Sequence, residues 1–398
     1  MADSRLPDDM LARFAERAPA YDRENSFFSD DFEELRQAGY LTMAVPADLG
    51  GAGMTLEEVM QEQRRLAYHA PADAVAVNMH LYWTGVAADL LRAGDESLVW
   101  LLEEAAAGEV FAAGHAERGN DLPLLFSSTK AERADGGWRF TGHKSFGTMT
   151  PVWTRLGLHG QDDSDPTNPK VVHAFLARDA EGVTVKETWD SLGMRATRSD
   201  DTVLDGAFVP DERVARVAPA GFAGMDLFTL AIFGWGEIGF SNVYYAIAQR
   251  AVDLTVEFLR EKTSVAIPRG RYAYHPEYQH GLAEMFVELD GLGPQLDTLA
   301  HAWSTTIADA ATWPAEAAGM WGLHLVGLKH RTTNAAFRIV DRAVELAGGF
   351  GVNRKSEIER LFRDARMGRI HPANFALVSE LTAKGLLGLD LDDPQRWG

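Results

Sequence analysis

The sequence predicts an α+β fold in which one block of β-strands lies between two blocks of helices. Apolar residues recur at helical spacing near the start, short alternating or β-branched segments follow, and helical spacing then returns to the end. Strands gathered in one block favour segregated layers over a Rossmann alternation. We expect an N-terminal all-α domain (1–110), a middle β-barrel-like domain (111–220) and a C-terminal four-helix-bundle domain (221–398).

The first block contains two amphipathic helices and one that is apolar nearly all round. Phe32, Leu35 and Ala38 recur three apart, and residues 56–70 show a similar spacing. Between them, VPADLGGAGM is a connector rich in Pro and Gly. Residues 72–94 are nearly uncharged over their first two-thirds, which is typical of a helix that is buried or faces a cavity.

The second and third blocks differ in texture. VFAAGHA, WRFTGHKSF, VVHAFLAR, VTVKETW and DTVLDGAFVP are short and separated by Gly, Asp, Pro and Asn clusters, as strands are. Helical spacing resumes at about residue 222. Two breaks interrupt it, TSVAIPRGRYAYHPEYQ and the Gly-rich start of LAGGFGVNRKSEIERLFRDAR.

Composition excludes several classes of function. The chain of 398 residues has a formal net charge of −20 and no strong basic patch, so we expect neither nucleic-acid nor membrane binding. It has no cysteine, which rules out thiolate metal sites and cysteine nucleophiles. The start of the sequence is acidic and polar, unlike a secretory signal, and we expect a cytoplasmic protein.

Five segments in order resemble the acyl-CoA dehydrogenase superfamily. These are the GY…VPADLGG connector, WRFTGHKSFGTM, LGMRATRSDDTVLDGAFVP, the turn LAGGFGVNR and the helix ERLFRDARMGRI. The resemblance covers nearly the whole chain. It implies a flavin-dependent oxidoreductase with FAD (FMN is the alternative) that assembles as a homo-oligomer, either a tetramer or a dimer.

The resemblance also assigns candidate cofactor contacts. It places Phe146, Gly147 and Thr148 beside the flavin ring, although Thr148 could equally cap backbone. The turn containing Gly348, Gly349 and Gly351 would hold the dinucleotide part of FAD across a subunit boundary, because glycine lets backbone N–H groups approach a pyrophosphate. A helix C-cap is the alternative. Arg195 and Ser199 could contact phosphate or order the loops of the β-domain.

The sequence departs from the dehydrogenases at their catalytic base. A carboxylate must take the α-proton of the acyl thioester, and many members carry it just after the RDAR helix. Here that position is Pro372, and the other known position corresponds to about Thr229. Glu237 is the nearest carboxylate. It could act as a displaced base, or it could form an ion pair within the helical bundle. The TEPxxGSD strand is also altered, to residues 116–121.

Two histidines could replace the carboxylate. His371 occupies the vacated neighbourhood, and His371-Pro372 resembles the His-Asp-Pro triplet of the monooxygenase branch typified by dibenzothiophene monooxygenase. In that branch a separate reductase supplies reduced flavin, which reacts with O2. A histidine can donate a hydrogen bond or a proton there, because its pKa lies near neutral pH. His80 is the second candidate. The alternative for His371 is a contact with the free carbonyls at a helix end, and the alternative for His80 is a buried position in the core.

Three functions therefore remain open. We favour a monooxygenase acting on a small apolar or aromatic molecule, with His371 and His80 as donors and a flavin reductase as partner. An acyl-CoA dehydrogenase with Glu237 or Glu117 as a displaced base is the second reading, and a flavin-binding subunit without turnover is the third. His115 and His143 are weaker candidates, and His275 with His280 lacks a third ligand, so no metal is expected.

Overall fold

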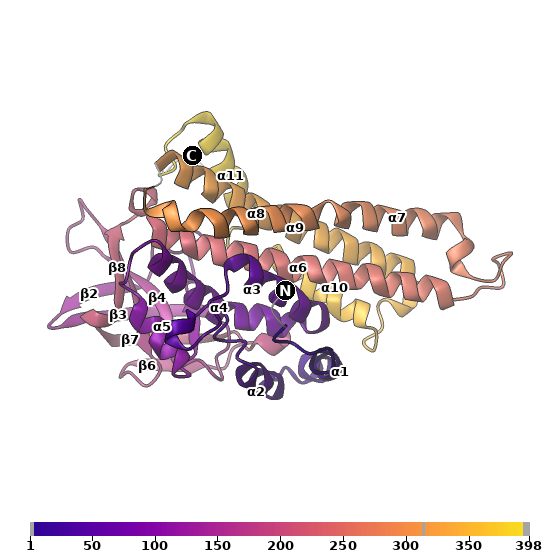
Figure 1. Cartoon of the computed structure of the whole chain (residues 1–398), viewed down its shortest axis with the longest axis horizontal. Coiled ribbons are helices and arrows are strands. Elements are labelled where there is room, and N and C mark those ends of the chain that lie inside the picture. Colours follow the sequence, from indigo (N-terminus) through magenta and orange to yellow (C-terminus); the bar gives the residue numbers. More distant parts are fainter. Residues whose placement is uncertain (1–3, 313–314, 393–398) are drawn as a thin grey trace.

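The computed structural model describes residues 4–312 and 315–392 and confirms the predicted order of helices, strands and helices (Figure 1). The N-terminal block holds five helices in its described residues: α1 (Asp8–Glu24), α2 (Ser29–Gln37), α3 (Leu56–His69), α4 (Pro71–Arg92) and α5 (Val99–Ala106). Helix α3 begins with a capping box, in which Thr55 and Glu58 satisfy each other's backbone N–H groups.

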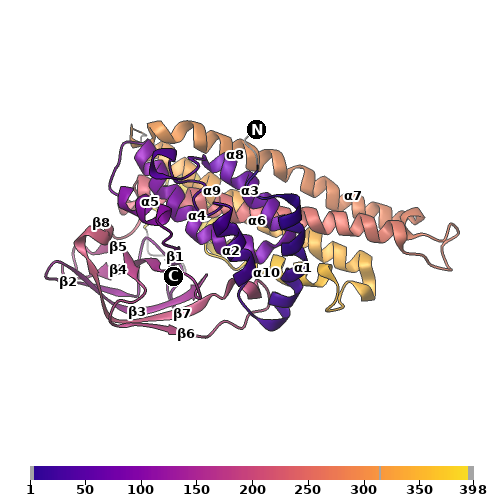
Figure 2. The ribbon, with the colours of Figure 1, turned by 60° about the horizontal axis from the view of Figure 1, so that its bottom comes forward.

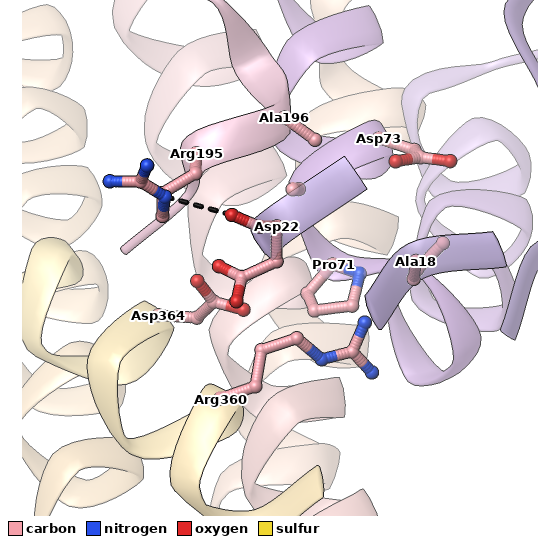
Figure 3. Close-up of a pocket in the computed structure, with 10 residues that line it drawn as sticks. Ala18, Asp22, Pro71, Asp73, Arg195, Ala196, Arg360 and Asp364 are labelled. Carbon is pink, nitrogen blue, oxygen red and sulfur yellow. Dashed lines mark hydrogen bonds between the residues drawn. The ribbon is translucent and has the colours of Figure 1, made fainter. Parts of the chain in front are cut away.

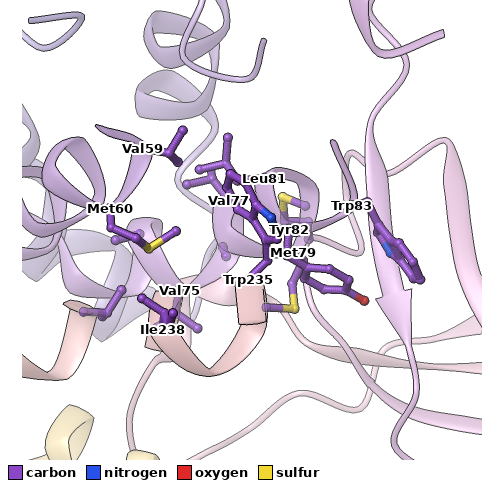
Figure 4. Packing of buried hydrophobic residues seen from close by; sticks show 14 of the residues in the cluster. Val59, Met60, Val75, Val77, Met79, Leu81, Tyr82, Trp83, Trp235 and Ile238 are labelled. Carbon is purple, nitrogen blue, oxygen red and sulfur yellow. The ribbon is translucent and has the colours of Figure 1, made fainter. Parts of the chain in front are cut away.

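Helix α4 is the buried centre of the first block. Nearly all of its residues are inaccessible to solvent, as its apolar sequence predicts, and it packs against α6 and the first strand. Figure 4 shows Val75, Val77 and Leu81 of α4 packed in the same cluster as Ile238 of α6. This helix therefore connects the N-terminal block to both others.

The middle block forms one mixed sheet, whose strands run in the order β6-β7-β3-β2-β4-β5-β8, with β1 parallel to β4. Figure 2 shows this sheet at one end of the molecule, below α5 and α4. On adjacent antiparallel strands, His159 of β4 lies directly opposite His173 of β5. The strands are β1 (Phe111–Gly114), β2 (Lys130–Ala134), β3 (Gly137–Gly147), β4 (Arg155–Asp162), β5 (Lys170–Ala177), β6 (Val183–Lys186), β7 (Asp200–Pro210) and β8 (Val214–Pro219).

The C-terminal block is built around two long helices, α6 and α9, which pack along each other. Helix α6 has 35 residues and is therefore about 50 Å long, running from the β-sheet to the far end of the molecule (Figure 1). The helices are α6 (Leu227–Glu261), α7 (Pro276–Asp290), α8 (Leu292–Thr306), α9 (Ala315–Ala347), α10 (Glu357–Gly368) and α11 (Phe375–Leu387). Among the described residues, no helix combines the length and apolarity needed to span a bilayer.

Candidate active site

The segment after β3 presents an exposed aromatic ring. Phe146 and Met149 both have left-handed backbone angles (φ 58° and 64°), which side chains other than glycine rarely adopt. Phe146 is 61% exposed and meets Trp189 edge-on, with 6.2 Å between ring centroids. A strained backbone that holds a large apolar ring in the open is typical of a ligand contact.

Thr148 lies at the head of a chain of hydroxyl groups. Its Oγ1 is 2.8 Å from Ser199 Oγ, which is 2.8 Å from Thr197 Oγ1, and Thr197 donates to the carbonyl of Met194. Because the Thr197 proton is used on a carbonyl, Ser199 must donate to Thr197 and Thr148 must donate to Ser199. The structure thus brings Thr148 and Ser199 together, and the Thr148 oxygen is left to accept from a ligand.

Arg195 is occupied within the chain. Its Nε donates to the carbonyl of Asp22, and its Nη1 to Asp190 and to the carbonyl of Ser191. Figure 3 shows Arg195 and Asp22 beside Asp364 and Arg360, around a small pocket between α1, the start of α4 and α10. Of the two roles that the sequence left open for Arg195, these contacts match the ordering of loops.

The RDAR helix supplies the other half of this cluster. Arg363 forms a bidentate pair with Asp22, and Asp364 accepts from the backbone N–H of Met194 at 2.6 Å. Burial raises the pKa of Asp364 to about 6. Charged side chains from all three blocks therefore hold the interface between them, and the motif has a structural purpose here.

The glycine turn lies on a different element from Phe146. Phe350 of that turn stacks on Phe258, near the C-terminal end of α6, whereas the N-terminal end of α6 packs beside the sheet. Gly348 has φ 59°, and a Cβ on Gly348 or Gly349 would meet no described atom within 4 Å. The turn is therefore open to a ligand.

His371 lies against α6, on the loop after α10. Its Nε2 is 2.8 Å from the Tyr244 hydroxyl, and its ring stacks on Phe240 at 4.7 Å. The described contacts give the buried Tyr244 hydroxyl only this acceptor, so Tyr244 donates to Nε2 and the ring proton lies on Nδ1. The Nδ1–H group is then left to donate to a ligand.

The pKa of His371 differs from the near-neutral value that the sequence led us to expect. Burial against α6, with the Lys329 ammonium nearby, lowers the pKa of His371 to about 3. The ring is consequently neutral at physiological pH and can donate a hydrogen bond without carrying a charge. Gly236, one turn before Phe240 on α6, leaves space beside it, since a Cβ there would meet no described atom within 4 Å.

Lys329 and Glu237 support the His371 loop from inside the bundle. Lys329 donates to the carbonyls of His371 (3.0 Å) and Ala373 (3.1 Å). Glu237 is buried, and one of its carboxyl oxygens has no hydrogen-bond partner in the described residues. Burial raises the pKa of Glu237 to about 7, although the positive charge of Lys329 opposes the shift. Glu237 is thus a buried carboxyl group that feels the charge of Lys329.

His80 is held by backbone on both sides of its ring. Its Nε2 lies 3.0 Å from the Leu41 carbonyl, and its Nδ1 accepts from the N–H of Phe111 at 3.0 Å. Burial lowers the pKa of His80 to about 4. These contacts fix α4 to the connector and to β1, and they leave neither ring nitrogen for a ligand. The structure therefore places His80 and His371 in separate surroundings.

Glu117 is equally committed. It accepts hydrogen bonds from Lys144, Asn120, Ser127 and the backbone N–H groups of Ser128 and Thr129. Burial would raise its pKa, but these donors, Lys144 foremost, hold the pKa of Glu117 at about 2. A carboxylate so stabilised is a poor base.

Sequence reasoning missed the partners of His371. Tyr244, Phe240 and Lys329 carry no motif of their own. The spacing of Phe240 and Tyr244, four apart on one helix, indicates a shared face, but nothing in the sequence shows that the loop after α10 lies on it.

Comparison with known proteins reveals relatives along the whole chain. Residues 6–99 match the model "Acyl-CoA dehydrogenase, N-terminal domain", and residues 238–375 match "Acyl-CoA dehydrogenase, C-terminal domain". The putative acyl-CoA dehydrogenase YdbM of Bacillus subtilis (strain 168) is 27% identical, over 93% of each chain.

Two further relatives are named as a nitrososynthase and a monooxygenase. L-evernosamine nitrososynthase of a Micromonospora species (strain ATCC 39149) is 27% identical over 96% of this chain and 89% of the relative. Dibenzothiophene monooxygenase of Rhodococcus qingshengii is 27% identical over 88% and 85%. Among solved structures, KijD3 in complex with FMN and dTDP-3-amino-2,3,6-trideoxy-4-keto-3-methyl-D-glucose superposes with a TM-score of 0.85 at 25% identity, covering 98% of this chain and 94% of KijD3.

Proposed function

Because the chain belongs to the acyl-CoA dehydrogenase superfamily of flavin-dependent oxidoreductases, we propose that it is a flavin-dependent monooxygenase. The observation that carries the proposal is the neutral His371 ring, which Tyr244 and Phe240 hold with its Nδ1–H free. The next residue, Pro372, occupies the position of the dehydrogenase base. Such a site offers a neutral hydrogen-bond donor at the place where many dehydrogenases carry a carboxylate.

The residues at hand fit a flavin. Phe146 offers an exposed ring face, Thr148 an acceptor oxygen and His371 a donor. Reduced flavin, when bound, would supply electrons to O2. His371 would orient an oxygen atom through Nδ1–H, and Tyr244 would keep the ring in that tautomer. We propose a small apolar or aromatic substrate beside Phe240 and Gly236, a separate flavin reductase and a cytoplasmic location.

Dehydrogenation of an acyl-CoA is the second candidate, favoured by the relative from Bacillus subtilis. It needs a carboxylate that reaches the substrate. Glu117 is held by five donors and is a poor base. Glu237 is buried, one of its carboxyl oxygens has no partner in the described residues and its pKa is raised to about 7, so this second candidate would assign the role of base to Glu237.

Rapid mixing tests the proposal. The flavin-loaded protein is reduced without oxygen and mixed with O2, and its absorbance is followed in time. We expect a transient that is neither reduced nor oxidised flavin, and we expect His371→Ala to shorten its lifetime by about ten- to a hundredfold. Pro372→Ala, in the same loop, should change the lifetime of the transient by no more than about twofold. Flavin affinity shows whether each variant is correctly folded.

Two results would contradict the proposal. Direct reoxidation of the reduced flavin without a transient would contradict a monooxygenase. Bleaching of the oxidised flavin by one of a panel of acyl-CoA thioesters, lost in Glu237→Gln, would instead establish a dehydrogenase.

A further inference from the structure

Three side chains outside the His371 site form a continuous chain of hydrogen bonds. The Tyr82 hydroxyl of α4 lies 2.7 Å from Nε2 of His115, just after β1. Nδ1 of His115 lies 3.3 Å from Nδ1 of His159 on β4. Tyr82 and His159 are buried and His115 is largely so. Buried polar groups in such a row require a consistent set of donors and acceptors.

The far end of the row determines which groups donate. The backbone N–H of Leu124 points at His159 Nε2 (3.3 Å), and the carbonyl of Phe126 lies 3.1 Å from the same atom. Asn120 already donates to that carbonyl at 2.6 Å, whereas the described contacts give the Leu124 N–H no other acceptor. With Nε2 of His159 unprotonated, the Leu124 N–H gains an acceptor and the Phe126 carbonyl keeps Asn120 as its donor.

The protonation state of His159 Nε2 determines the tautomers of the other groups in the row. His159 then carries its proton on Nδ1 and donates to His115 Nδ1, so His115 carries its proton on Nε2 and donates to the Tyr82 oxygen. The Tyr82 hydroxyl proton is consequently not used inside the row. Tyr82 is 3% exposed, so this proton needs an acceptor that is not solvent.

The same atoms also accommodate the opposite set of protons. If His159 Nε2 is protonated, it donates to Phe126, His115 donates from Nδ1 to His159, and Tyr82 donates to His115. The two sets are the states before and after one proton passes along the row. Because His159 Nε2 has both an acceptor and a donor within reach, neither state leaves it unpaired.

The row ends near the segment that presents Phe146. Ala116, next to His115, accepts through its carbonyl from the N–H of Ser145 at 2.9 Å, and Phe146 and Thr148 follow directly. Figure 4 shows the Tyr82 ring leaving α4 beside Met79, toward the β-strands. His115, the partner of Tyr82, is therefore one residue away from a backbone contact with the segment that presents Phe146.

The charges around the row keep it neutral at rest. Burial, with Lys144 and neighbouring histidines, holds the pKa of His115 and of His159 well below the usual value. The carboxylate of Glu117 lies 3.8 Å from His159 Nε2, beyond hydrogen-bond distance. It would attract a proton arriving at that atom.

We propose that Tyr82, His115 and His159 form a relay that delivers a proton to the ligand bound beside Phe146 and Thr148. In one passage, Tyr82 gives its proton to the ligand and His115 Nε2 gives its proton to Tyr82. His159 Nδ1 then gives its proton to His115 Nδ1, and one solvent proton binds at His159 Nε2, beneath the partly exposed 118–128 loop. One proton enters and one leaves. The assignment of the ligand as flavin rests on the proposed function.

Nitrogen NMR of the flavin-free protein tests the resting state. With histidine labelled on both ring nitrogens, we expect His115 protonated on Nε2 and His159 on Nδ1, with a through-hydrogen-bond coupling between the two Nδ1 atoms. Unprotonated Nδ1 atoms on both rings, or a charged His159 at pH 7, would overturn the relay. This result does not depend on the reaction that the protein catalyses.

Kinetics tests the passage itself. Tyr82→Phe and His159→Gln should each slow the proton-dependent step of flavin reoxidation by about tenfold or more, with flavin affinity unchanged. The double variant should be no slower than either, because both interrupt one chain. His173→Gln is the matched control: His173 is equally buried and stacks on His159, but lies outside the row.

Two outcomes count against the relay. A His159→Gln variant as fast as the wild type, or single effects that multiply in the double variant, would refute it. A wild type with no transient at all would refute the monooxygenase proposal instead, and the NMR result would still decide the hydrogen bonds.

Discussion

Glu117 and Lys144 form a buried ion pair at the centre of the β-block. Both side chains are inaccessible to solvent, and Lys144 also donates to the carbonyl of His159. A buried pair adds little over an apolar pair, but removing one partner leaves an uncompensated charge. The pair therefore determines whether the loop of residues 118–129 stays folded over the strands.

We expect Glu117→Gln to lower the free energy of unfolding by about 3–5 kcal/mol. Lys144→Met should recover much of that loss when added to it, because the unpaired ammonium is then gone. The measurement is urea denaturation of the two single variants and the double variant at pH 7. Equal losses in the single variants that add in the double variant would contradict this account.

The pH dependence of the same carboxylate has a definite sign. Its folded pKa of about 2 lies below the unfolded value, so the unfolded state binds a proton first as the pH falls. The stability that Glu117 contributes is complete above about pH 5 and is lost as the pH falls from there toward 2. Acid unfolding of the wild type should therefore include a transition component that Glu117→Gln lacks.

Residue types alone could not rank the histidines. The sequence singles out His371 by its place after the RDAR helix. His80, in an apolar helix, looked more useful than His115, whose neighbours are charged. In the structure, backbone groups use both nitrogens of His80, whereas His115 joins Tyr82 to His159. These contacts join strands and a helix that are distant in sequence, and spacing carries no information about them.

At the scale of elements, the approach of α4 to α6 positions both candidate sites. A Cβ on Gly85 would lie 2.2 Å from the ring of Trp235, whose Nε1 donates to Asp89 together with that of Trp303. The sequence predicted a buried helix over 72–94, but not that one glycine determines how closely it approaches its neighbour.

Gly85→Ala should therefore destabilise the protein by about 1–3 kcal/mol or more, because a fully buried indole cannot move aside. Gly322→Ala in α9 is the control, since its Cβ would meet no described atom within 4 Å and alanine favours helix by up to about 1 kcal/mol. Thermal unfolding of both variants decides the point. A Gly85→Ala variant as stable as the control would contradict a close contact between Gly85 and the Trp235 ring.

At the scale of the whole molecule, the two groups of predicted flavin contacts lie on separate elements. Phe146 and Thr148 follow β3 and contact residues 197–199, whereas the glycine turn lies beside Phe258, near the C-terminal end of α6. The order of the three blocks could be predicted from periodicity. This separation could not, because it depends on how α6 and α9 run between the ends.

This separation distinguishes FAD from FMN. FMN has no adenosine part, so it needs only the contacts near the sheet, whereas FAD would also need the turn of a second copy. Gly349 is exposed and a side chain there meets nothing in its own chain, so Gly349→Leu should fold normally. If the protein binds FAD across two copies, we expect this variant to weaken FAD by about tenfold or more and to leave FMN unchanged. Titration calorimetry with both flavins, alongside the mass in solution, gives the answer. Equal affinity for FAD in variant and wild type would show that the turn does not hold the cofactor, and FMN would then be the flavin that this site fits.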